Sequence, residues 1–450
     1  MFLYLKADVL IIGGGDGGLA VFRMVKALRP DWEVVVVKPE VGFCFKCPLP
    51  FYIAGEAPAE GVFLRDEEMF KGAHLVYAHA VDASHVSREV RLSSGEVIKF
   101  EKAVVIATGS QPYLPKIEGS ALENVFTLRS FESANAISNA LKTANSAVIV
   151  GGGYIATEIS EAFVKKEVAT HLVVRSRILR GSFDEDFSTT FKVELEKHGV
   201  KVHQGRNVVK IAGSKKVEKV VLDDGSEIKA DLVVFATGVK PVLEPAMKLG
   251  TAIGQLGILV DDRMETSLKG VYAVGEVAET KNLVSGKPTT CKTAATAMAQ
   301  GAVAGYNIAG YAITYPGDAD CLISKLFNLH IGKAGLTTEE ALSSGFNPIS
   351  KVVKYRDHYT SLPGGNEFTA KVIFDMNTGM LIGCQFIGQA NVSDKVEAAA
   401  LALRFKARIT DLVSYSSASF PASTFNPRFN QFREPAQQVF KELLDIFKKA

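Results

Sequence analysis

Residues 9–18 read VLIIGGGDGG and join a β-branched run to three spaced glycines, Gly13, Gly15 and Gly18. A strand that ends in G-x-G-x-x-G and opens a helix predicts a loop that cradles a pyrophosphate. The first glycine allows a tight turn, the second lets the backbone approach the phosphates, and the third packs the helix on the strand. The helix N-terminus adds amide donors and a partial positive charge. This stretch therefore predicts an α/β nucleotide-binding domain.

A second unit of the same kind begins at residue 146, where the strand AVIV runs into GGGYIATEISEAFVKK and then into the strand HLVV. Its loop carries Gly151, Gly153 and Ala156 at the same spacing. Over both units, short β-branched runs alternate with helix-period stretches, which is typical of an α/β protein. The repeat predicts two nucleotide-binding domains.

The last third of the chain has a different pattern. TAKVIFD, the turn MNTGM and LIGCQFIG predict a strand–turn–strand, and an alanine-rich helix is expected over residues 396–405. An amphipathic helix is expected over residues 439–449. These features indicate a third domain of the α+β kind.

The composition is that of a globular protein with several domains, since 450 residues are too many for one hydrophobic core. The 51 basic and 49 acidic residues give a formal charge of +2, which leaves no basic surface for nucleic acid. No apolar run reaches the roughly 18 residues of a membrane span, so a membrane is not an expected partner. The N-terminus has no signal cleavage site, and the 5 cysteines exclude a disulfide scaffold. A cytoplasmic protein without a metal is expected.

The residue that closes the second strand of each unit contacts the adenosine ribose. A carboxylate there selects NAD, whereas arginine suits a 2′-phosphate. In the second unit Arg175 and Arg177 occupy this place, and the bidentate fork of arginine favours a phosphate monoester. NADPH is therefore favoured over NADH, with solvent-facing arginines as the alternative. In the first unit the strand ends at Lys38 with no acid before Glu40, so the usual ribose contact is missing or displaced.

Five further motifs follow these two units or lie within and between them. They are VVIATGS at residues 104–110, GGGYIATE at 151–158, VVFATGVKP at 233–241, GVYAVGE at 270–276 and GLTTEEA at 335–341. With these motifs, the chain resembles the pyridine nucleotide–disulfide oxidoreductase family over nearly its full length. Within that family it is most similar to the single-cysteine branch of coenzyme A disulfide reductases, NADH oxidases, NADH peroxidases and polysulfide reductases.

The resemblance implies the fold, the cofactors and the assembly. The fold would be glutathione reductase-like, with two Rossmann-like domains and an α+β dimerisation domain. Residues 1–112 and 240–317 would bind FAD, residues 113–239 would bind NADPH or NADH, and residues 318–450 would hold a homodimer together.

The resemblance also implies cofactor contacts. From the crossover segments and the segment beside the flavin they are Thr108, Gly109, Gly238, Gly275 and Glu276. Glu276 is one methylene longer than the usual aspartate, and the helix over about residues 294–309 would aim its N-terminal dipole at the flavin ring. Tyr154 would cover the flavin and swing aside for the nicotinamide, or else be a core aromatic. Glu158 would hold the carboxamide or the flavin edge.

Cys47 lies immediately before Pro48, which is favoured at the first helical position, so Cys47 is expected as the N-cap of a short helix. A thiol there ionises more readily, which suits a nucleophile or a donor to flavin. The redox cysteine of the family lies at the matching place. Cys44 makes a CxxC with Cys47 and either forms a bridge with it or fills space near the flavin. The other thiols are expected to be structural: Cys291, Cys321 and Cys384.

Asp16 occupies the position at which oxidase and peroxidase relatives resemble G-x-x-H-x-G. Two interpretations stay open. Asp16 is a proton carrier with a raised pKa beside the cysteine, or it is an acid that satisfies amide donors where the helix begins.

In the coenzyme A branch, tyrosines of the dimerisation domain reach the cysteine of the partner. The residues at these positions here are Ser361, Leu362 and Ser419, with Tyr359, Tyr415 and Phe420 nearby. Their replacement disfavours specific coenzyme A disulfide activity.

These residues predict an FAD-dependent NAD(P)H oxidoreductase. Hydride would pass to the flavin with Tyr154 displaced, and two electrons would go on to a disulfide, persulfide or sulfenate at Cys47, whose thiolate attacks a small sulfur substrate. One alternative is an NAD(P)H oxidase or peroxidase that reduces oxygen or peroxide. Others are a membrane-surface sulfide:quinone oxidoreductase that uses the C-terminal helix, and a non-enzymatic flavin redox sensor. The intact GGGYIATE favours a nicotinamide over a quinone.

Overall fold

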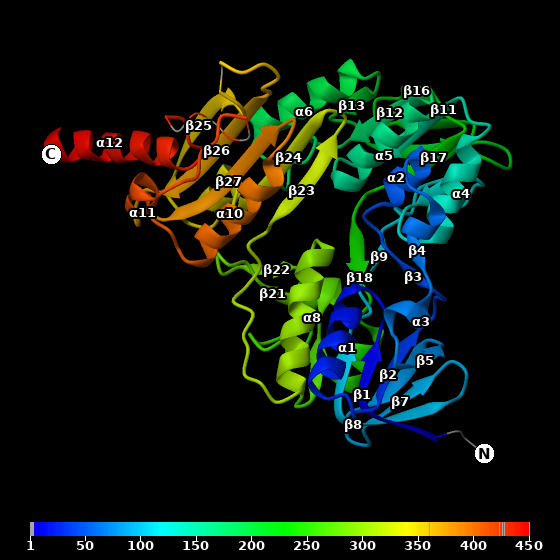
Figure 1. The fold of residues 1–450 in the computed structure, drawn as a ribbon. Coiled ribbons are helices and arrows are strands. Elements are labelled where there is room, and N and C mark those ends of the chain that lie inside the picture. The colour runs from blue at the N-terminus through cyan, green and yellow to red at the C-terminus, as the bar shows by residue number, and fades with distance from the viewer. Residues whose placement is uncertain (1–3, 360, 423, 425, 427, 450) are drawn as a thin grey trace.

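The computed structural model describes residues 4–359, 361–422, 424, 426 and 428–449. It contains three large sheets, each with helices of its own (Figure 1). The sheet of the first unit lies at one end of the molecule, and the other two lie next to each other at the opposite end. The α/β fold predicted from the sequence is confirmed.

The first sheet is parallel around its centre and carries an antiparallel hairpin at one edge. Its strands in spatial order are β5 (His74–Tyr77), β2 (Val34–Lys38), β1 (Tyr4–Ile12), β8 (Val97–Ile106), β7 (Glu89–Leu92) and β6 (Ala80–Ser84). A further strand, β20 (Val271–Ala273), pairs in parallel with β8. A segment from beyond the second unit therefore completes the first sheet. The domain boundaries expected at residues 112, 239 and 317 stay predictions.

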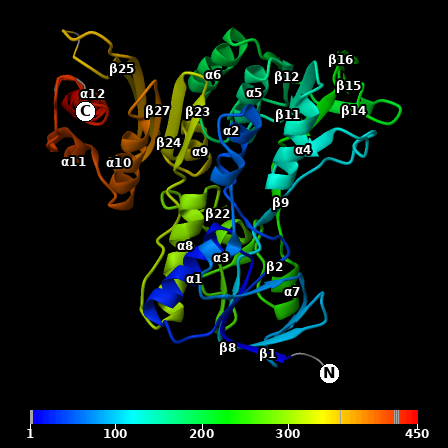
Figure 2. The ribbon, with the colours of Figure 1, turned by 45° about the vertical axis from the view of Figure 1, so that its right-hand side comes forward.

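Helices α1 (Asp16–Leu28) and α8 (Ala294–Ile308) lie side by side and pack on this sheet (Figure 2). Glycines allow their close approach. A Cβ at Gly301 would lie 2.3 Å from the carbonyl oxygen of Gly17, and a Cβ at Gly305 would lie 2.6 Å from Cβ of Met24. The packing fixes the first glycine loop against the start of α8.

Gly301→Ala is expected to lower the melting temperature, because the added methyl group would press on the backbone of α1. Overpacking of this kind costs about 1–3 kcal/mol, which thermal denaturation followed by circular dichroism would detect. Gly181→Ala is the matched control, because a Cβ at Gly181 meets nothing within 4 Å. Equal melting temperatures for the two variants would contradict this account of the helix pair.

The second sheet is parallel throughout. Its strands in spatial order are β10 (Val125–Thr127), β17 (Leu232–Phe235), β11 (Ser146–Val150), β12 (Ala169–Val174) and β13 (Lys201–Gln204). Its helices are α4 (Phe131–Leu141), α5 (Tyr154–Lys165) and α6 (Glu185–Lys197). A small antiparallel sheet packs against it and consists of β14 (Val208–Ala212), β15 (Lys219–Leu222) and β16 (Glu227–Lys229). As the sequence repeat predicts, β11 and α5 reproduce the arrangement of β1 and α1.

Two short antiparallel strands, β9 (Ser110–Pro112) and β18 (Val239–Pro241), connect the two nucleotide-binding units. The Thr108 hydroxyl donates to the carbonyl of Val242 at 2.7 Å, and the amide of Val242 donates to the carbonyl of Gly109 at 3.0 Å. The two connections are therefore held together next to the end of β8.

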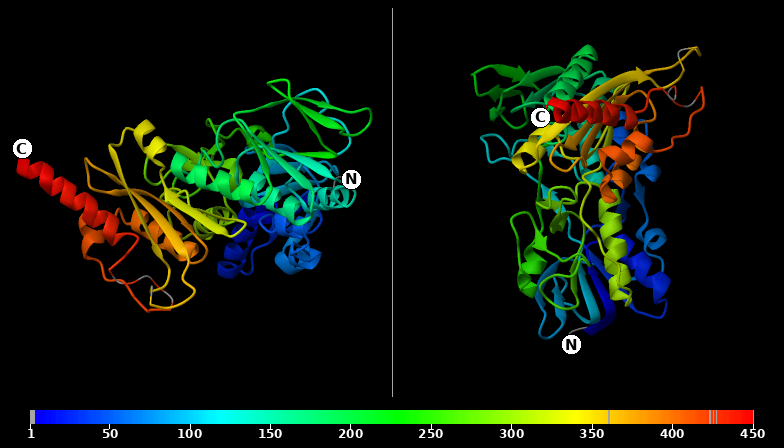
Figure 3. Two further views of the ribbon diagram at one scale, coloured as in Figure 1. Left: turned by 90° about the horizontal axis from the view of Figure 1, so that it is seen from above. Right: turned by 90° about the vertical axis from the view of Figure 1, so that its left-hand side faces the viewer.

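The third sheet is antiparallel, and the predicted strand–turn–strand forms its centre. Its strands in spatial order are β23 (Leu322–Leu326), β24 (Leu329–Gly335), β27 (Leu381–Gly388), β26 (Glu367–Asp375) and β25 (Pro348–Arg356). The helices that complete this part are α9 (Thr338–Ser343), α10 (Val392–Arg404), α11 (Ile409–Ser414) and α12 (Arg433–Lys449). Both α10 and α12 begin earlier than predicted, because Val392 and Ala436 are buried and extend the apolar faces. The end of α12 projects from the molecule (Figure 3).

The remaining elements are short. They are β3 (Phe43–Cys44), α2 (Leu49–Ala54), η1 (Ala59–Gly61), β4 (Phe63–Leu64), α3 (Asp66–Met69), α7 (Glu244–Leu249), β19 (Ile258–Leu259), η2 (Gly275–Val277), β21 (Ala278–Lys281) and β22 (Pro288–Thr290). None of the helices among the described residues has the length and apolarity that crossing a bilayer requires.

Candidate active site

The first glycine loop has the shape that a pyrophosphate needs. Gly13 has a φ of +113°, and a Cβ there would lie 2.1 Å from the carbonyl oxygen of Ala107. A Cβ at Gly18 would lie 2.2 Å from the carbonyl oxygen of Gly13, so this position packs the helix on the loop. At Gly15, by contrast, a Cβ would meet nothing within 4 Å. The loop is thus tight at its first and third glycines and open at its second, which fits a dinucleotide such as FAD.

The second glycine loop repeats this arrangement. Gly151 has a φ of +135°, and its Cβ would lie 2.2 Å from the carbonyl oxygen of Ala236. Gly153 faces open space, and Ala156, in the first turn of α5, is fully buried. The residues present therefore fit a second dinucleotide.

Lys38 ends β2 and is buried, with an ion pair of 2.6 Å to Asp66 and a hydrogen bond of 2.7 Å to the carbonyl of Gly42. The other oxygen of Asp66 accepts from the amide of Gly42 at 2.6 Å. A Cβ at Gly14 would lie 2.6 Å from Cδ of Lys38, so the stem of the lysine supports the glycine loop. The sequence did not single out Asp66, which fixes the ammonium group of Lys38.

Glu276 lies in a network with groups from two other segments. Arg129 makes a bidentate contact with its carboxylate, and the hydroxyl of Ser110 donates to it at 2.9 Å. Although burial acts to raise its pKa, Arg129 and Ser110 lower the pKa of Glu276 below the usual value. The neighbouring amide of Gly275 donates to the side-chain oxygen of Gln300 on α8 at 2.8 Å. Glu276 is therefore held as a carboxylate at the start of α8.

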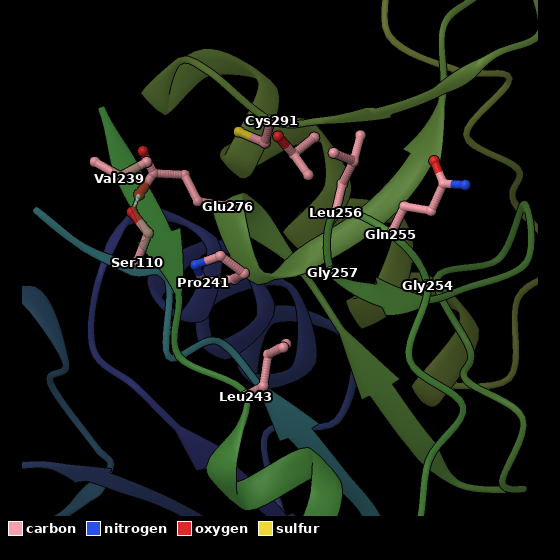
Figure 4. A pocket seen from close by; sticks show the side chains of 11 residues that line it. Ser110, Val239, Pro241, Leu243, Gly254, Gln255, Leu256, Gly257, Glu276 and Cys291 are labelled. Atoms are coloured by element: carbon pink, nitrogen blue, oxygen red, sulfur yellow. Dashed lines mark hydrogen bonds between the residues drawn. The ribbon is translucent and has the colours of Figure 1, made fainter. Parts of the chain in front are cut away.

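Glu276 also lines a cavity of about 310 Å³ between the crossover strands and the loop that precedes β19 (Figure 4). Ser110 and Cys291 lie on the walls of the same cavity. Gly238, at the entry to β18, has a φ of +101°, and its carbonyl accepts from the amide of Tyr113 at 2.8 Å. Of the crossover residues named from the sequence, Gly109 comes near Glu276, since a Cβ there would lie 3.8 Å from the Glu276 carboxylate.

Cys47 lies in a turn between β3 and α2 rather than at the N-cap of the helix. The amide of Leu49 donates to the carbonyl of Lys46 at 3.2 Å, and Pro48 is the N-cap. The expectation that Cys47 caps the helix was wrong, because this turn delays the helix to Leu49. Cys47 as a whole residue is exposed, but its thiol is partly buried. This burial is the largest cause that raises the pKa of the thiol, and the charges of Asp16 and Glu158 add to it. The sequence predicted a thiol that ionises easily, whereas the protein side chains around Cys47 make its ionisation harder.

Asp16 and Lys46 act on the Cys47 thiol with opposite charges, and Arg129 acts in turn on both of them. Burial raises the pKa of Asp16, with Lys46 opposing the rise and Glu276 adding to it. Burial and the neighbouring Arg129 lower the pKa of Lys46. The sequence analysis named neither Lys46 nor Arg129. Lys46 could have been found because it directly precedes Cys47, whereas no motif surrounds Arg129.

Cys44 lies in β3 and packs at the edge of the core beneath α2. All five cysteines are free thiols, so Cys44 and Cys47 do not form a bridge in this structure. Burial raises the pKa of Cys44 to about 11. Cys44 is therefore a largely protonated, space-filling thiol.

Tyr154 begins α5 and is half-buried, with its ring centre 6.5 Å from that of Phe183. Its hydroxyl is buried, and burial raises the pKa of Tyr154 against the lowering effect of the Ser182 side chain. Both interpretations of Tyr154, a movable cover or a core aromatic, stay predictions.

Two glutamates on one face of α5 meet the third domain differently. Glu161 is clasped by ion pairs to Lys165 at 2.8 Å and Lys325 at 3.1 Å and by the amide of Phe327 at 2.7 Å. In the part of the chain that the structure describes, Glu158 has one hydrogen-bond partner, the hydroxyl of Ser324, which donates to it at 2.5 Å. Burial raises the pKa of Glu158 to about 7, against the lowering effect of that hydrogen bond. Glu158 is therefore the member of the pair that exchanges a proton near neutral pH.

Glu158→Gln is expected to lower the pKa of the Cys47 thiol, because the Glu158 carboxylate is one of the charges that raise it. The alkylation rate of Cys47 by iodoacetamide, followed against pH by peptide mass spectrometry, measures this pKa. Glu132→Gln is the matched control, because Glu132 raises the pKa of Cys44. An unchanged alkylation profile in Glu158→Gln would show that Glu158 does not act on the thiol.

The two arginines after β12 differ in their surroundings. Arg175 is exposed, and no ion pair among the described residues includes it. Arg177 donates to the carbonyl of Phe183 at 3.1 Å and pairs with Glu339 of α9 at 3.3 Å. The structure thus leaves Arg175 exposed after β12 and ties Arg177 to the third domain, and the ribose contact expected of both stays a prediction.

In the third domain, the loop after β25 meets the segment before α12. The hydroxyls of Tyr359 and Ser419 lie 2.9 Å apart. Tyr415 donates to the side chain of Asn430 at 2.7 Å, and Phe420 and Leu362 are exposed. Tyr359 is thereby joined to Ser419, and the expectation that Ser419 stands where the coenzyme A branch has a tyrosine stays a prediction.

Residues 7–301 match the family model described as pyridine nucleotide-disulphide oxidoreductase, and residues 323–425 match the dimerisation domain of that family. The chain therefore belongs to the pyridine nucleotide-disulphide oxidoreductase family, as its motifs predict. It is an FAD-dependent oxidoreductase that uses NAD(P)H.

Similar proteins carry related names. A relative from Pyrococcus abyssi named NAD(P)H sulfur oxidoreductase (CoA-dependent) is 37% identical over 412 residues, 89% of this chain and 91% of the relative. A relative from Methanocaldococcus jannaschii named NADH oxidase is 30% identical over 420 residues, 90% of this chain and 93% of the relative. The structure of an NAD-dependent persulfide reductase from A. fulgidus has a TM-score of 0.91 at 28% identity, covering 97% of this chain and 83% of that one.

Proposed function

We propose that this enzyme reduces sulfur–sulfur bonds of small molecules with NAD(P)H, through FAD and the thiol of Cys47. The observation that carries the proposal is an exposed, free thiol whose pKa responds to two protonatable carboxyl groups, Asp16 and Glu158. The names of the relatives from Pyrococcus abyssi and A. fulgidus support a sulfur acceptor.

The glycine loops would bind the pyrophosphates, and the groups around Glu276 would bind the flavin's ribityl chain. The proposed cofactor contacts are Gly13, Gly15, Gly18, Lys38, Thr108, Gly109, Gly275 and Glu276 for FAD, and Gly151, Gly153, Ala156, Glu158, Arg175, Arg177 and Gly238 for the nicotinamide coenzyme. In this assignment Lys38 acts through the loop that its stem supports. Bound FAD supplies the transfer of two electrons from a hydride to sulfur.

Carboxyl groups near Cys47 would donate and accept the protons of the reaction. The thiolate of Cys47 attacks the substrate disulfide, forms a mixed disulfide and releases one thiolate. Two electrons then break the mixed disulfide, and a proton is needed for the second thiolate. Glu158, with a pKa of about 7, and Asp16, with a raised pKa, would supply and take back that proton.

The decisive experiment is a steady-state assay of the purified yellow protein with coenzyme A disulfide, polysulfide and oxygen as separate acceptors. Turnover with a sulfur acceptor well above that with oxygen supports the proposal. The reverse order would favour an oxidase, the activity named for the Methanocaldococcus jannaschii relative. The chain would act as a homodimer, since residues 323–425 match a dimerisation domain.

For the coenzyme, NADPH is proposed as the preferred reductant, because Arg175 follows β12 and is exposed. Arg175→Ala is expected to raise the Michaelis constant for NADPH about tenfold, in line with the loss of one charge-assisted contact, and to leave that for NADH unchanged. If Arg175→Ala changed the Michaelis constants for NADPH and NADH equally, Arg175 would not be the contact of the 2′-phosphate.

A further inference from the structure

The third domain reaches the loop that follows β12 through the first turn of α9. Glu339 pairs with Arg177 at 3.3 Å and with Arg180 at 3.0 Å. Both arginines belong to the loop that would face the adenosine ribose, 162 and 159 residues away in sequence. A carboxylate from one domain therefore lies within the arginine cluster of another.

A buried clamp holds Glu339 in this place. Asp184 accepts hydrogen bonds from the amide of Thr338 at 2.9 Å and from its hydroxyl at 2.7 Å. Asp184 also pairs with Lys371 at 2.7 Å, and its amide donates to the side chain of Gln385 at 2.9 Å. Because Thr338 adjoins Glu339, the clamp fixes the start of α9 against the arginine loop.

The three arginines of this cluster differ in whether they pair with Glu339. Hydrogen bonds from Arg180 and Arg177 lower the pKa of Glu339, so it is a carboxylate at neutral pH. Arg177 is further engaged by a backbone carbonyl, while Arg175 stays exposed. Of the three arginines at the loop that would face the ribose, two share the single negative charge of Glu339. A 2′-phosphate bound there would also meet the negative charge of Glu339.

We propose that Glu339 is a specificity-determining residue that weakens binding of the 2′-phosphate of NADPH and so brings the affinities for NADPH and NADH closer together. The inference rests on the proposed coenzyme site. NADH lacks the 2′-phosphate, and its binding does not depend on Glu339. The third domain thereby weakens the preference for NADPH that the second domain would provide.

The test measures binding of two fragments, adenosine 2′,5′-bisphosphate and 5′-AMP, to the FAD-loaded protein by calorimetry. In Glu339→Gln the dissociation constant of the bisphosphate is expected to fall about fivefold, the size expected for one partly exposed like charge. That of 5′-AMP should stay the same. The difference should shrink at high salt, which screens exposed charges.

Glu196→Gln is the matched control, because Glu196 is an exposed glutamate paired with Lys192 on α6, outside this loop. Unchanged or weaker bisphosphate binding in Glu339→Gln would overturn the inference. Weaker binding would mean that Glu339 holds the arginines ready for the phosphate.

Arg175→Ala separates this inference from the proposed coenzyme site. If Arg175→Ala weakens bisphosphate binding while Glu339→Gln changes nothing, the coenzyme site stands and the role of Glu339 fails. If Glu339→Gln tightens binding while Arg175→Ala has no effect, Glu339 acts as proposed and Arg175 is not the phosphate contact. Neither result depends on which sulfur acceptor the enzyme uses.

Discussion

Replacing Cys47 with serine is expected to lower turnover of a disulfide or polysulfide by about a thousandfold or more, the size seen when a covalent nucleophile is removed. Serine keeps the size and the turn of the segment, but its hydroxyl does not form a mixed disulfide. FAD content and the rate of flavin reduction by NAD(P)H should stay close to those of the wild type. The measurements are steady-state assays and anaerobic stopped-flow absorbance.

Cys44→Ser is the matched control for this variant. Cys44 lies close in sequence, but its thiol packs at the edge of the core and has a pKa of about 11. The variant should keep most of the sulfur reductase activity. If Cys47→Ser turned over sulfur substrates at the wild-type rate, the thiol mechanism would be wrong. Oxygen consumption that survives in Cys47→Ser would instead identify a flavin oxidase.

The fold was predictable because its signals are local. Each glycine loop joins an apolar strand to a helix within a few residues, and Gly13 and Gly151 have the positive φ values that such loops require. The motif at Cys47 also predicted a short helix after the cysteine, and α2 is that helix. Its helix cap was not predictable, because the choice between Cys47 and Pro48 depends on a turn that the sequence pattern does not distinguish.

The parts of the site that the sequence missed are long-range contacts. Arg129 meets Glu276 across 147 residues, and Ser324 meets Glu158 across 166 residues. A hydrogen bond of this kind leaves no periodic pattern and no motif in either segment. The same holds for Glu339. The sequence predicted Arg177 as a ligand of the 2′-phosphate, but Glu339 makes it a member of an ion pair.

These contacts also explain why the thiol of Cys47 does not behave as the sequence suggested. A helix N-terminus lowers a thiol pKa, but here the N-cap is Pro48, one residue after Cys47. Burial and the charges of Asp16 and Glu158 raise the pKa of the thiol instead. Burial raises the pKa of Glu158 to about 7, so Glu158 carries a negative charge above that pH. That charge adds to the effects of burial and Asp16, which raise the pKa of the Cys47 thiol.

Two alanine variants of the second glycine loop are expected to differ in effect. Gly151→Ala should lower the stability of the protein, and Gly153→Ala should weaken coenzyme binding. A Cβ at Gly151 would lie 2.2 Å from the carbonyl oxygen of Ala236, at a φ of +135°. The strained backbone alone costs about 1–3 kcal/mol, so Gly151→Ala should unfold at a clearly lower temperature. A Cβ at Gly153 meets no protein atom within 4 Å, and its φ of −88° suits alanine. Gly153→Ala should keep the melting temperature of the wild type.

The coenzyme separates the two variants further. In Gly153→Ala the methyl group would occupy the space through which the pyrophosphate approaches the backbone, so the dissociation constant for NAD(P)H should rise about tenfold or more. FAD should stay bound, because its own loop is unchanged. Differential scanning fluorimetry measures the stability, and the rate of flavin reduction against NAD(P)H concentration measures the binding. A Gly153→Ala protein that bound NAD(P)H normally would place the pyrophosphate away from this loop, since the open space at Gly153 is the reason for expecting it there.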